Sequence, residues 1–147
     1  METNDEQGKE LIQKLILTAL DSRRRSYVPY SGFSVGAALL GKSGKIYCGC
    51  NIENSSFGAT NCAERTAFFS AVNQGEKEFD AIAIVGGKAE NGPSSYCPPC
   101  GICRQVMLEF CDPDKFRIIL AKSKDDFCIY KLSQLIPVSF GPKDLGK

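Results

Sequence analysis

Apolar residues recur at intervals of three and four positions in several parts of the chain. In residues 10–25 these positions are Leu11, Ile12, Leu15, Ile16, Ala19 and Leu20. This spacing places them on one face and predicts an amphipathic helix. Two further helices are predicted over residues 62–73, ending near Gly75, and over residues 100–110, and a short last helix over residues 132–136.

Apolar runs that are too short for helices predict five strands. These runs are residues 33–40, 46–53, 81–85, 116–121 and 127–130. A glycine-containing turn joins the first two, which predicts a hairpin, and a charged turn joins the last two. The segment 86–99 is rich in Gly, Ser, Pro and Asn and is expected to be a loop.

The order of these elements indicates the fold class. Helices precede, separate and follow the strands, and the apolar faces of a sheet need such cover. The sequence therefore predicts the α/β class, with a single mixed sheet of about five strands sandwiched by helices. A chain of 147 residues has the usual length of one domain, so we expect a single domain over residues 1–147.

Charge excludes one class of partner. The chain has 18 Lys and Arg against 17 Asp and Glu, which lacks the basic excess that binding to a phosphate backbone needs. Its first residues are acidic where a secretory signal is basic, and no apolar run approaches the roughly 18 residues of a membrane span. We expect a soluble cytoplasmic protein that binds neither nucleic acid nor membrane.

Cysteine and histidine usage narrows the chemistry. The sequence has eight Cys and no His. Without His there is no Ser-His-Asp triad, no Cys-His nucleophile pair and no imidazole ligand. A transition-metal site would have to be built from thiolates and carboxylates, and acid or base catalysis falls to other side chains.

Three cysteines lie where predicted helices begin. Cys62 opens one helix, and Cys100 and Cys103 open another as a Cys-x-x-Cys pair. Exposed N–H groups and the helix dipole stabilise thiolates at such positions. Zinc prefers four ligands, and three protein ligands leave the fourth position for water, which is the catalytic arrangement.

Glu64 lies two positions after Cys62, so its carboxylate is expected beside the metal rather than on it. There it can exchange protons with a water and a substrate nitrogen, which makes it the candidate general acid and base.

Two alternatives involve other cysteines. A structural zinc site would be closed by a fourth sulfur, from Cys97, Cys48 or Cys50. Cys97-Pro98-Pro99-Cys100 also matches the thioredoxin pattern, in which Cys97 and Cys100 would form a disulfide. The redox reading leaves Glu64 without a role.

Several motifs together resemble those of a known family. They are residues 33–39 (FSVGAAL), 51–54 (NIEN), 61–67 (NCAERTA), 99–105 (PCGICRQ) and 139–142 (SFGP). The pattern Cys-x-Glu followed by Pro-Cys-x-x-Cys is the three-cysteine form of the zinc deaminase signature. The chain is similar to the cytidine deaminases of the small homotetrameric type. This resemblance implies a three-layer α/β/α fold, one Zn²⁺ per subunit, and hydrolysis of cytidine and deoxycytidine to uridine and deoxyuridine with release of ammonia.

The resemblance also implies roles for particular residues. Cys62, Cys100 and Cys103 would bind zinc, Glu64 would carry protons, and Arg65 would donate hydrogen bonds to the ligand sulfurs. The implied substrate-binding residues are Tyr30, Phe33, Asn51, Glu53, Phe57, Ala63 and Phe140.

Among these, Asn51 and Glu53 would bind the ribose, and Phe140 would stack on the base from a neighbouring subunit in a homotetramer. Many relatives carry Tyr where this chain has Phe57, so a hydroxyl is lacking there.

Rival functions remain at this point. A deaminase of another aminopyrimidine nucleoside, such as blasticidin S, would share the zinc motifs. A nucleic-acid-editing deaminase would need a basic groove that the sequence does not indicate. A non-catalytic zinc protein is the alternative from another class. The Asn51 and Glu53 pair and the Phe140 segment favour a free pyrimidine nucleoside as substrate.

Overall fold

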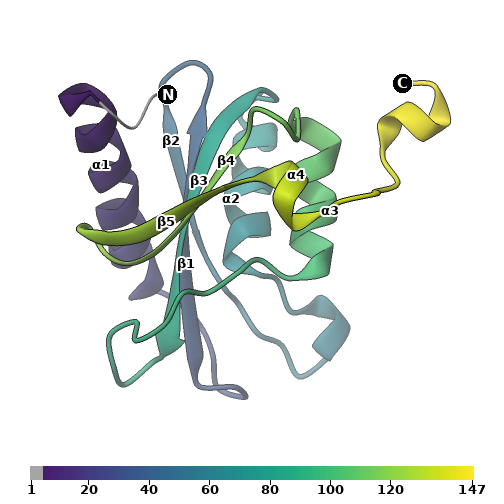
Figure 1. The fold of residues 1–147 in the computed structure, drawn as a ribbon. Coiled ribbons are helices and arrows are strands. Elements are labelled where there is room, and N and C mark those ends of the chain that lie inside the picture. The colour runs from purple at the N-terminus through teal and green to yellow at the C-terminus, as the bar shows by residue number, and fades with distance from the viewer. Residues whose placement is uncertain (1–4) are drawn as a thin grey trace.

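A five-stranded sheet forms the centre of the computed structural model, which describes residues 5–147 (Figure 1). Its strands are β1 (Phe33–Gly41), β2 (Ile46–Cys50), β3 (Phe79–Lys88), β4 (Arg117–Ser123) and β5 (Asp126–Lys131). They lie in the order β2-β1-β3-β4-β5. The pair β3 and β4 is parallel and the other neighbours are antiparallel, so the predicted mixed sheet is confirmed.

Helices cover both faces of the sheet. They are α1 (Glu6–Arg23), α2 (Ala63–Asn73), α3 (Gly101–Phe110) and α4 (Leu132–Leu135). Figure 1 shows α1 on one face and α2 and α3 on the other. One apolar core lies between the sheet and α1, and a second lies between the sheet and α2, α3 and α4. The three-layer α/β/α architecture is thereby confirmed.

Some element boundaries differ from those predicted. The first helix begins earlier, at Glu6, because the Asp5 carboxylate caps it by accepting a hydrogen bond from the Gly8 N–H. The third strand extends to Lys88, beyond the predicted end at residue 85, because Gly86 and Gly87 pair with β1. Pairing with a neighbour therefore overrides the low strand propensity of glycine.

The second strand is shorter than predicted, since it ends at Cys50 rather than at residue 53. Asn51 keeps one main-chain bond to β1, from its N–H to the Val35 carbonyl at 3.3 Å, and its carbonyl accepts from the Tyr27 N–H instead of continuing the ladder. Its side-chain amide adds two bonds to the backbone of β1. Beyond it, Ile52 forms isolated bridges with Tyr27 and Asn61. Asn51 and Glu53 therefore lie on an extended connection beyond the strand rather than within it.

The last eleven residues, 137–147, form a C-terminal arm. Figure 1 shows this arm in yellow, extending away from the sheet beyond α3. It contains a short 3-10 helix, Pro142–Leu145, and exposes Val138, Phe140 and Leu145. Large apolar side chains without cover often mark a surface that binds a partner.

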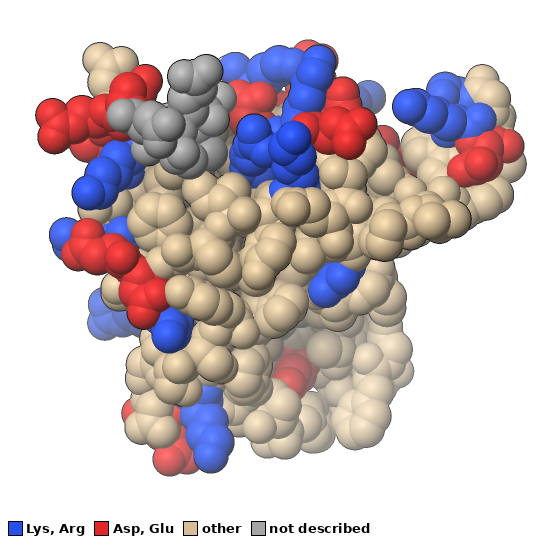
Figure 2. Space-filling model, in the orientation of Figure 1, with Lys and Arg blue, Asp and Glu red and all other residues tan. Residues whose placement is uncertain are grey.

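Charged side chains are distributed without a dominant sign. Figure 2 shows Lys and Arg interspersed with Asp and Glu toward the edges of this face, with a broad uncharged area between them. Within residues 5–147, none of the helices combines the length and apolar character needed to cross a bilayer.

Candidate active site

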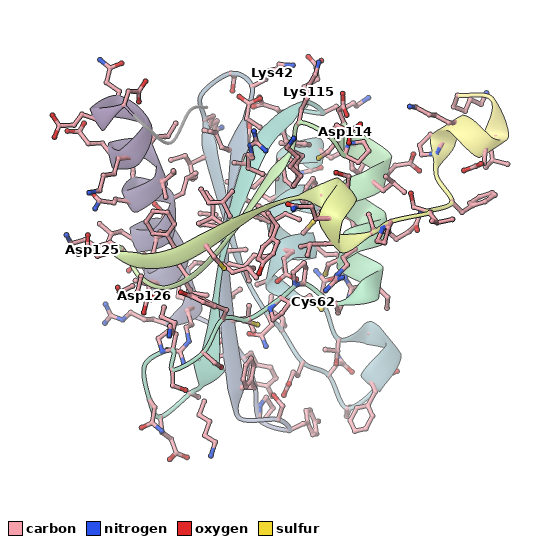
Figure 3. The ribbon with its side chains drawn as sticks, viewed as in Figure 1. Lys42, Cys62, Asp114, Lys115, Asp125 and Asp126 are labelled. Atoms are coloured by element: carbon pink, nitrogen blue, oxygen red, sulfur yellow. The ribbon has the colours of Figure 1, made fainter. Side chains whose placement is uncertain are left out.

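The starts of α2 and α3 bring three cysteines together. Cys62 is the N-cap of α2 and Cys100 is the N-cap of α3, and Cys103 lies in the first turn of α3. Neither N-cap side chain makes a capping hydrogen bond to its helix, so both sulfurs are free to point toward a shared ligand. The three Sγ atoms all lie within 4.8 Å of one another. Figure 3 shows Cys62 at the end of α2 that faces the start of α3.

This sulfur group fits a tetrahedral metal ion. The Sγ atoms of Cys62 and Cys100 are 3.7 Å apart. A tetrahedral zinc ion with Zn–S bonds of about 2.3 Å places its sulfurs roughly 3.8 Å apart. Thiolates are also ligands that zinc prefers. Both the spacing and the chemistry of the donors therefore suit zinc.

A helix packed against a glycine sets the position of Cys62. A Cβ atom on Gly49 of β2 would lie 2.4 Å from the Ala63 carbonyl oxygen and 2.6 Å from the Ala67 nitrogen. No side chain fits there, so the first turn of α2 rests directly on the strand. This close approach carries Cys62 toward Cys100.

The environment of the sulfurs favours negative charge on one of them. Hydrogen bonds from Cys103, Arg65 and Cys100 hold the pKa of Cys62 well below its usual range. The same hydrogen bond between Cys62 and Cys103, together with burial, raises the pKa of Cys103. A cation is therefore the ligand that this group would attract.

Arg65 supplies positive charge beside the sulfurs. Its Nη2 donates to the Cys62 Sγ at 3.3 Å. Its Nε is buried and has no hydrogen-bond partner among the described residues. A guanidinium with a donor to spare can offset the charge of several thiolates on one metal ion.

Glu64 is the buried carboxyl of this region. It is 4% exposed and occupies the second position of α2. Burial, and then the nearby Cys62 sulfur, raise the pKa of Glu64 to about 7. Such a group can both accept and donate a proton near neutral pH.

A small cavity joins the sulfurs to the carboxyl. It has a volume of about 160 Å³. Its lining residues are Val35, Asn51, Cys62, Ala63, Glu64, Cys97, Pro98 and Cys100. The cavity therefore presents two of the three clustered thiols, those of Cys62 and Cys100, and the Glu64 carboxyl to anything that enters it.

Cys97 lines this cavity but does not belong to the group of three close sulfurs. Burial raises the pKa of the Cys97 thiol to about 11, which disfavours the thiolate that a redox pair needs. Cys97 and Cys100 are both free thiols here, so the structure does not contain the disulfide of the redox alternative.

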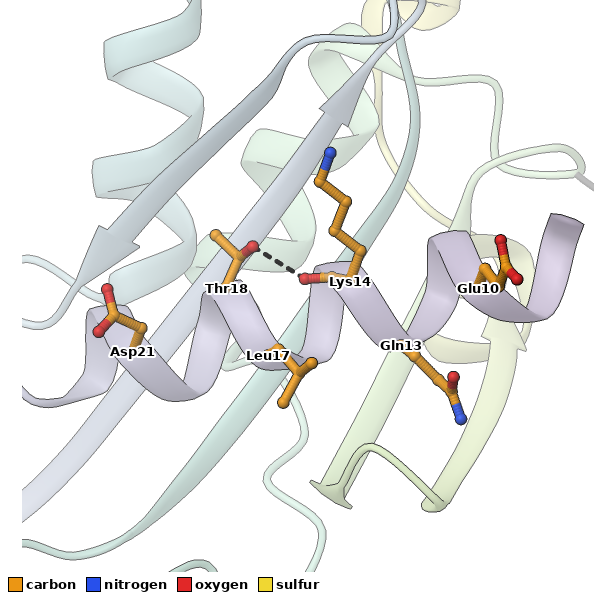
Figure 4. Close-up of a pocket in the computed structure, with 6 residues that line it drawn as sticks. All are labelled: Glu10, Gln13, Lys14, Leu17, Thr18 and Asp21. Carbon is orange, nitrogen blue, oxygen red and sulfur yellow. Dashed lines mark hydrogen bonds between the residues drawn. The ribbon is translucent and has the colours of Figure 1, made fainter.

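Another depression lies on the outer side of α1. It measures about 530 Å³ and is lined by Glu10, Gln13, Lys14, Leu17, Thr18 and Asp21 (Figure 4). It is open and shallow, and it contains none of the thiols. The chemistry of the chain is therefore concentrated in the smaller cavity.

Comparison with protein families agrees with this geometry. Residues 9–119 match the model described as the cytidine and deoxycytidylate deaminase zinc-binding region. The chain belongs to this deaminase family. The matched region contains all three clustered cysteines, so zinc is the cofactor of this deaminase and the sulfur group is where it could bind.

Individual relatives span nearly the whole chain. The cytidine deaminase of Sporosarcina psychrophila is 48% identical over 92% of this chain and 95% of its own length. That of Halalkalibacterium halodurans is 45% identical over 91% of this chain and 97% of its own. A crystal structure of cytidine deaminase from Burkholderia pseudomallei has a TM-score of 0.77 and 43% identity, covering 86% of this chain and 97% of that one. The deaminase therefore shares its fold with these enzymes.

The deaminase uses Asn51 and Glu53 structurally. The Asn51 Oδ1 accepts from the Val35 N–H at 2.9 Å, and its Nδ2 donates to the Phe33 carbonyl at 2.8 Å. The Glu53 Oε1 accepts from the Tyr30 and Ser31 N–H groups, both at 3.0 Å. A hydrogen bond from the Ser31 side chain, followed by these backbone bonds, lowers the pKa of Glu53, which keeps it charged.

The expected aromatic residues lie in three places. The rings of Tyr30 and Phe57 meet edge to face, with centroids 5.8 Å apart, and both are exposed. Phe33 is also exposed, and its ring lies near Gly86 beside Cys97. Phe140 lies apart from all of them, on the C-terminal arm, and does not line the cavity of its own chain.

Two cavity residues were not predicted from the sequence. Val35 and Pro98 line the cavity together with the expected residues. Pro98 directly precedes the Pro-Cys-x-x-Cys motif, and Val35 lies within the 33–39 motif, so proximity to those motifs was the available signal. Gly49 had no such signal, because only the packing of α2 reveals its importance.

Proposed function

We propose that this chain catalyses the zinc-dependent hydrolytic deamination of cytidine and deoxycytidine to uridine and deoxyuridine, with release of ammonia. The observation that carries the proposal is a carboxyl, Glu64, buried to 4% exposure in the cavity that two clustered thiols also line. A structural zinc site needs no such carboxyl. The names of relatives at 45% and 48% identity support the same activity.

Glu64 is the proton carrier in this proposal. Zinc bound to the three sulfurs supplies the Lewis acidity that makes a water molecule nucleophilic near neutral pH. The Glu64 carboxylate takes a proton from the attacking water and passes it to N3 of the cytosine ring. The carboxylate then takes the second proton of that water, from the hydroxyl now on C4, and delivers it to the exocyclic amino group, so that the C4–N bond breaks and ammonia rather than an amide anion leaves.

Glu53 and Asn51 are proposed to hold the sugar. Both backbone bonds to Glu53 go to Oε1, which leaves lone pairs on Oε2 for a ribose hydroxyl. Asn51 lines the cavity and can donate its second amide hydrogen. A carboxylate near the sugar also repels a phosphate, which favours a free nucleoside over a nucleotide chain.

Apolar residues are proposed to hold the base. Phe33, Tyr30 and Phe57 would pack around it, since aromatic rings supply large contact areas. Ala63 lines the cavity, and as the first residue of α2 its N–H has no partner within the helix. This N–H can therefore bond to the substrate.

We further propose that the active unit is a homotetramer whose subunits share sites. A cavity of about 160 Å³ in one chain is smaller than the roughly 300–1,000 Å³ of typical ligand sites. The Phe140 ring is 62% exposed on the C-terminal arm. An arm from a neighbouring subunit would complete the site with this ring.

The chain is further proposed to form one domain and to work in the cytoplasm. Both apolar cores pack on one sheet, which supports a single folding unit. All eight cysteines are free thiols, as a reducing compartment would keep them.

Mixing cytidine with purified zinc-loaded protein, and following the ultraviolet change to uridine, tests the activity. The substitution Glu64→Gln should lower turnover by at least about 100-fold and leave zinc content and melting temperature unchanged. Glu109→Gln, which alters an exposed carboxylate on α3, is the matched control and should act as wild type. An inert wild-type protein that contains zinc would refute the proposal. Turnover of blasticidin S but not of cytidine would show that the substrate is another aminopyrimidine nucleoside.

A further inference from the structure

Arg104 makes two hydrogen bonds that join separate parts of the chain. It lies on α3, one turn after Cys100. Its Nε donates to the Pro99 carbonyl at 2.8 Å, and its Nη1 donates to the Leu135 carbonyl at 2.6 Å. One guanidinium thus connects the segment before the Cys100 ligand with the end of α4.

The bond to Pro99 controls the backbone of Cys100. Cys100 has no side-chain bond to its own helix, so its sulfur is oriented through the main chain. The Pro99 carbonyl belongs to the peptide that leads into Cys100, and it points to the Arg104 Nε. The Arg104 N–H also donates to the Cys100 carbonyl, at 3.0 Å. The guanidinium therefore holds the peptide before this cysteine, while the helix backbone holds the peptide after it.

The bond to Leu135 controls the root of the C-terminal arm. Leu135 is the last residue of α4, two residues before the arm begins. The next residue of α3 adds a second attachment, because the Gln105 Nε2 donates to the Phe140 carbonyl at 2.9 Å. The arm is thus fastened to α3 at its root and at Phe140.

We propose that Arg104 and Gln105 are positioning residues that link the thiol site of one subunit to the arm that presents Phe140. Arg104 holds the backbone before Cys100 and the root of the arm, whereas Gln105 contacts only the arm. The effect on a neighbouring site rests on the proposed function of Phe140. A planar guanidinium can donate to two carbonyls in different directions. A lysine ammonium is a compact point charge and cannot make both bonds.

Three variants separate these roles. Arg104→Lys keeps the charge but loses the two carbonyl bonds, and Gln105→Ala loses only the contact with the arm. Arg24→Ala removes an exposed guanidinium at the end of α1 and is the control.

Zinc transfer to a chelating dye reports on how firmly Cys100 is held. Hydrogen–deuterium exchange over residues 100–103 and 136–141 reports on each attachment without any substrate. Circular dichroism melting verifies that each variant folds, and Arg104→Gln replaces the lysine variant if that one does not.

The expected pattern differs for each variant. Arg104→Lys should release zinc roughly tenfold faster, exchange faster in both segments and raise KM for cytidine as well as lower kcat. Gln105→Ala should exchange faster over residues 136–141 and raise KM, with zinc release and kcat as in wild type. Arg24→Ala should match wild type throughout.

Several outcomes would overturn the link. Arg104→Lys with wild-type zinc release, or with wild-type exchange over residues 136–141, contradicts it. So does faster zinc release in Gln105→Ala. If the wild type fails to deaminate cytidine, the proposed function fails, while zinc release and exchange still decide whether Arg104 joins the two segments.

Discussion

Glu64 and Arg65 are adjacent in the sequence, yet the fold gives them different surroundings. Successive helix positions point about 100° apart, because a turn holds 3.6 residues. Glu64 is therefore buried in the cavity, while the Arg65 guanidinium reaches the Cys62 sulfur at 3.3 Å. A proton carrier and a fixed cation thus serve the same sulfur group from two sides.

Removing the Arg65 cation should weaken the hold on zinc. Arg65→Ala deletes the hydrogen bond to Cys62 and leaves the thiolate charge without its neighbour. We expect roughly tenfold faster zinc transfer to a chelating dye and a lower kcat for cytidine. Arg65→Lys keeps the positive charge without the planar donors, so its zinc transfer rate and kcat should lie between those of Arg65→Ala and wild type. Wild-type values for Arg65→Ala in both assays would exclude this role.

At the level of elements, the approach of α2 to β2 determines where Cys62 lies. The backbone of α2 meets Gly49 so closely that no Cβ can be accommodated. This contact fixes the start of α2 against the sheet, and with it the positions of Cys62 and Glu64.

A methyl group at Gly49 should displace this helix start. Gly49→Ala places a Cβ 2.4 Å from the Ala63 carbonyl, and overpacking of this kind costs about 1–3 kcal/mol. We expect a lower melting temperature and faster zinc release. Gly92→Ala is the control, because a Cβ there meets nothing within 4 Å. Equal stability of the two variants would show that α2 can shift without consequence.

Glu76 fastens the end of α2 to the turn between β1 and β2. Its Oε1 accepts from the Ser43 N–H at 2.9 Å, and its Oε2 accepts from the Ser43 and Tyr47 hydroxyls, both at 2.7 Å. Bonds to the charged form, those from Ser43 first, lower the pKa of Glu76 from its ordinary value of 4.5.

This shift predicts a pH-dependent contribution to stability. Because the folded pKa lies below the unfolded value, the stabilisation is complete above pH 4.5 and is lost as the pH falls through the folded pKa. Glu76→Gln should therefore melt below wild type at neutral pH, and the gap should narrow steadily below pH 4.5. Melting curves of both proteins across this range test it, and a gap independent of pH would contradict it.

At the level of the whole molecule, the C-terminal arm lies away from the cavity of its own chain. Phe140 on this arm is 62% exposed, and Val138 has a left-handed backbone conformation with a φ of 49°. An extended segment with uncovered apolar side chains is typical of a contact between subunits.

Shared sites can be tested by mixing two impaired proteins. Phe140→Ala should raise KM for cytidine about tenfold, since burying an aromatic ring contributes about 1.5 kcal/mol or more. Mixed with Glu64→Gln at low cytidine concentration, it should recover part of the activity, because each variant supplies what the other lacks. Native mass spectrometry checks that subunits exchange. Exchange without recovery would mean that each chain completes its own site.

The local elements and the reactive residues were predictable from the sequence. Periodicity located the helices and strands, because it reflects which side of a short segment faces the core. Residue type located the chemistry, because an absence of His leaves thiols and carboxylates as the candidates. Motif spacing also identified Cys62, Glu64, Cys100 and Cys103 as one constellation before any packing was known.

The tertiary structure decided how closely these groups meet and how each is held. Cys62 and Cys100 are 38 positions apart in sequence, and their 3.7 Å separation depends on two helices packing against the same sheet. The same packing buries Glu64, makes Gly49 indispensable and commits the Asn51 amide to β1. Such features arise from contacts between distant segments, and local patterns of residue type carry no record of them.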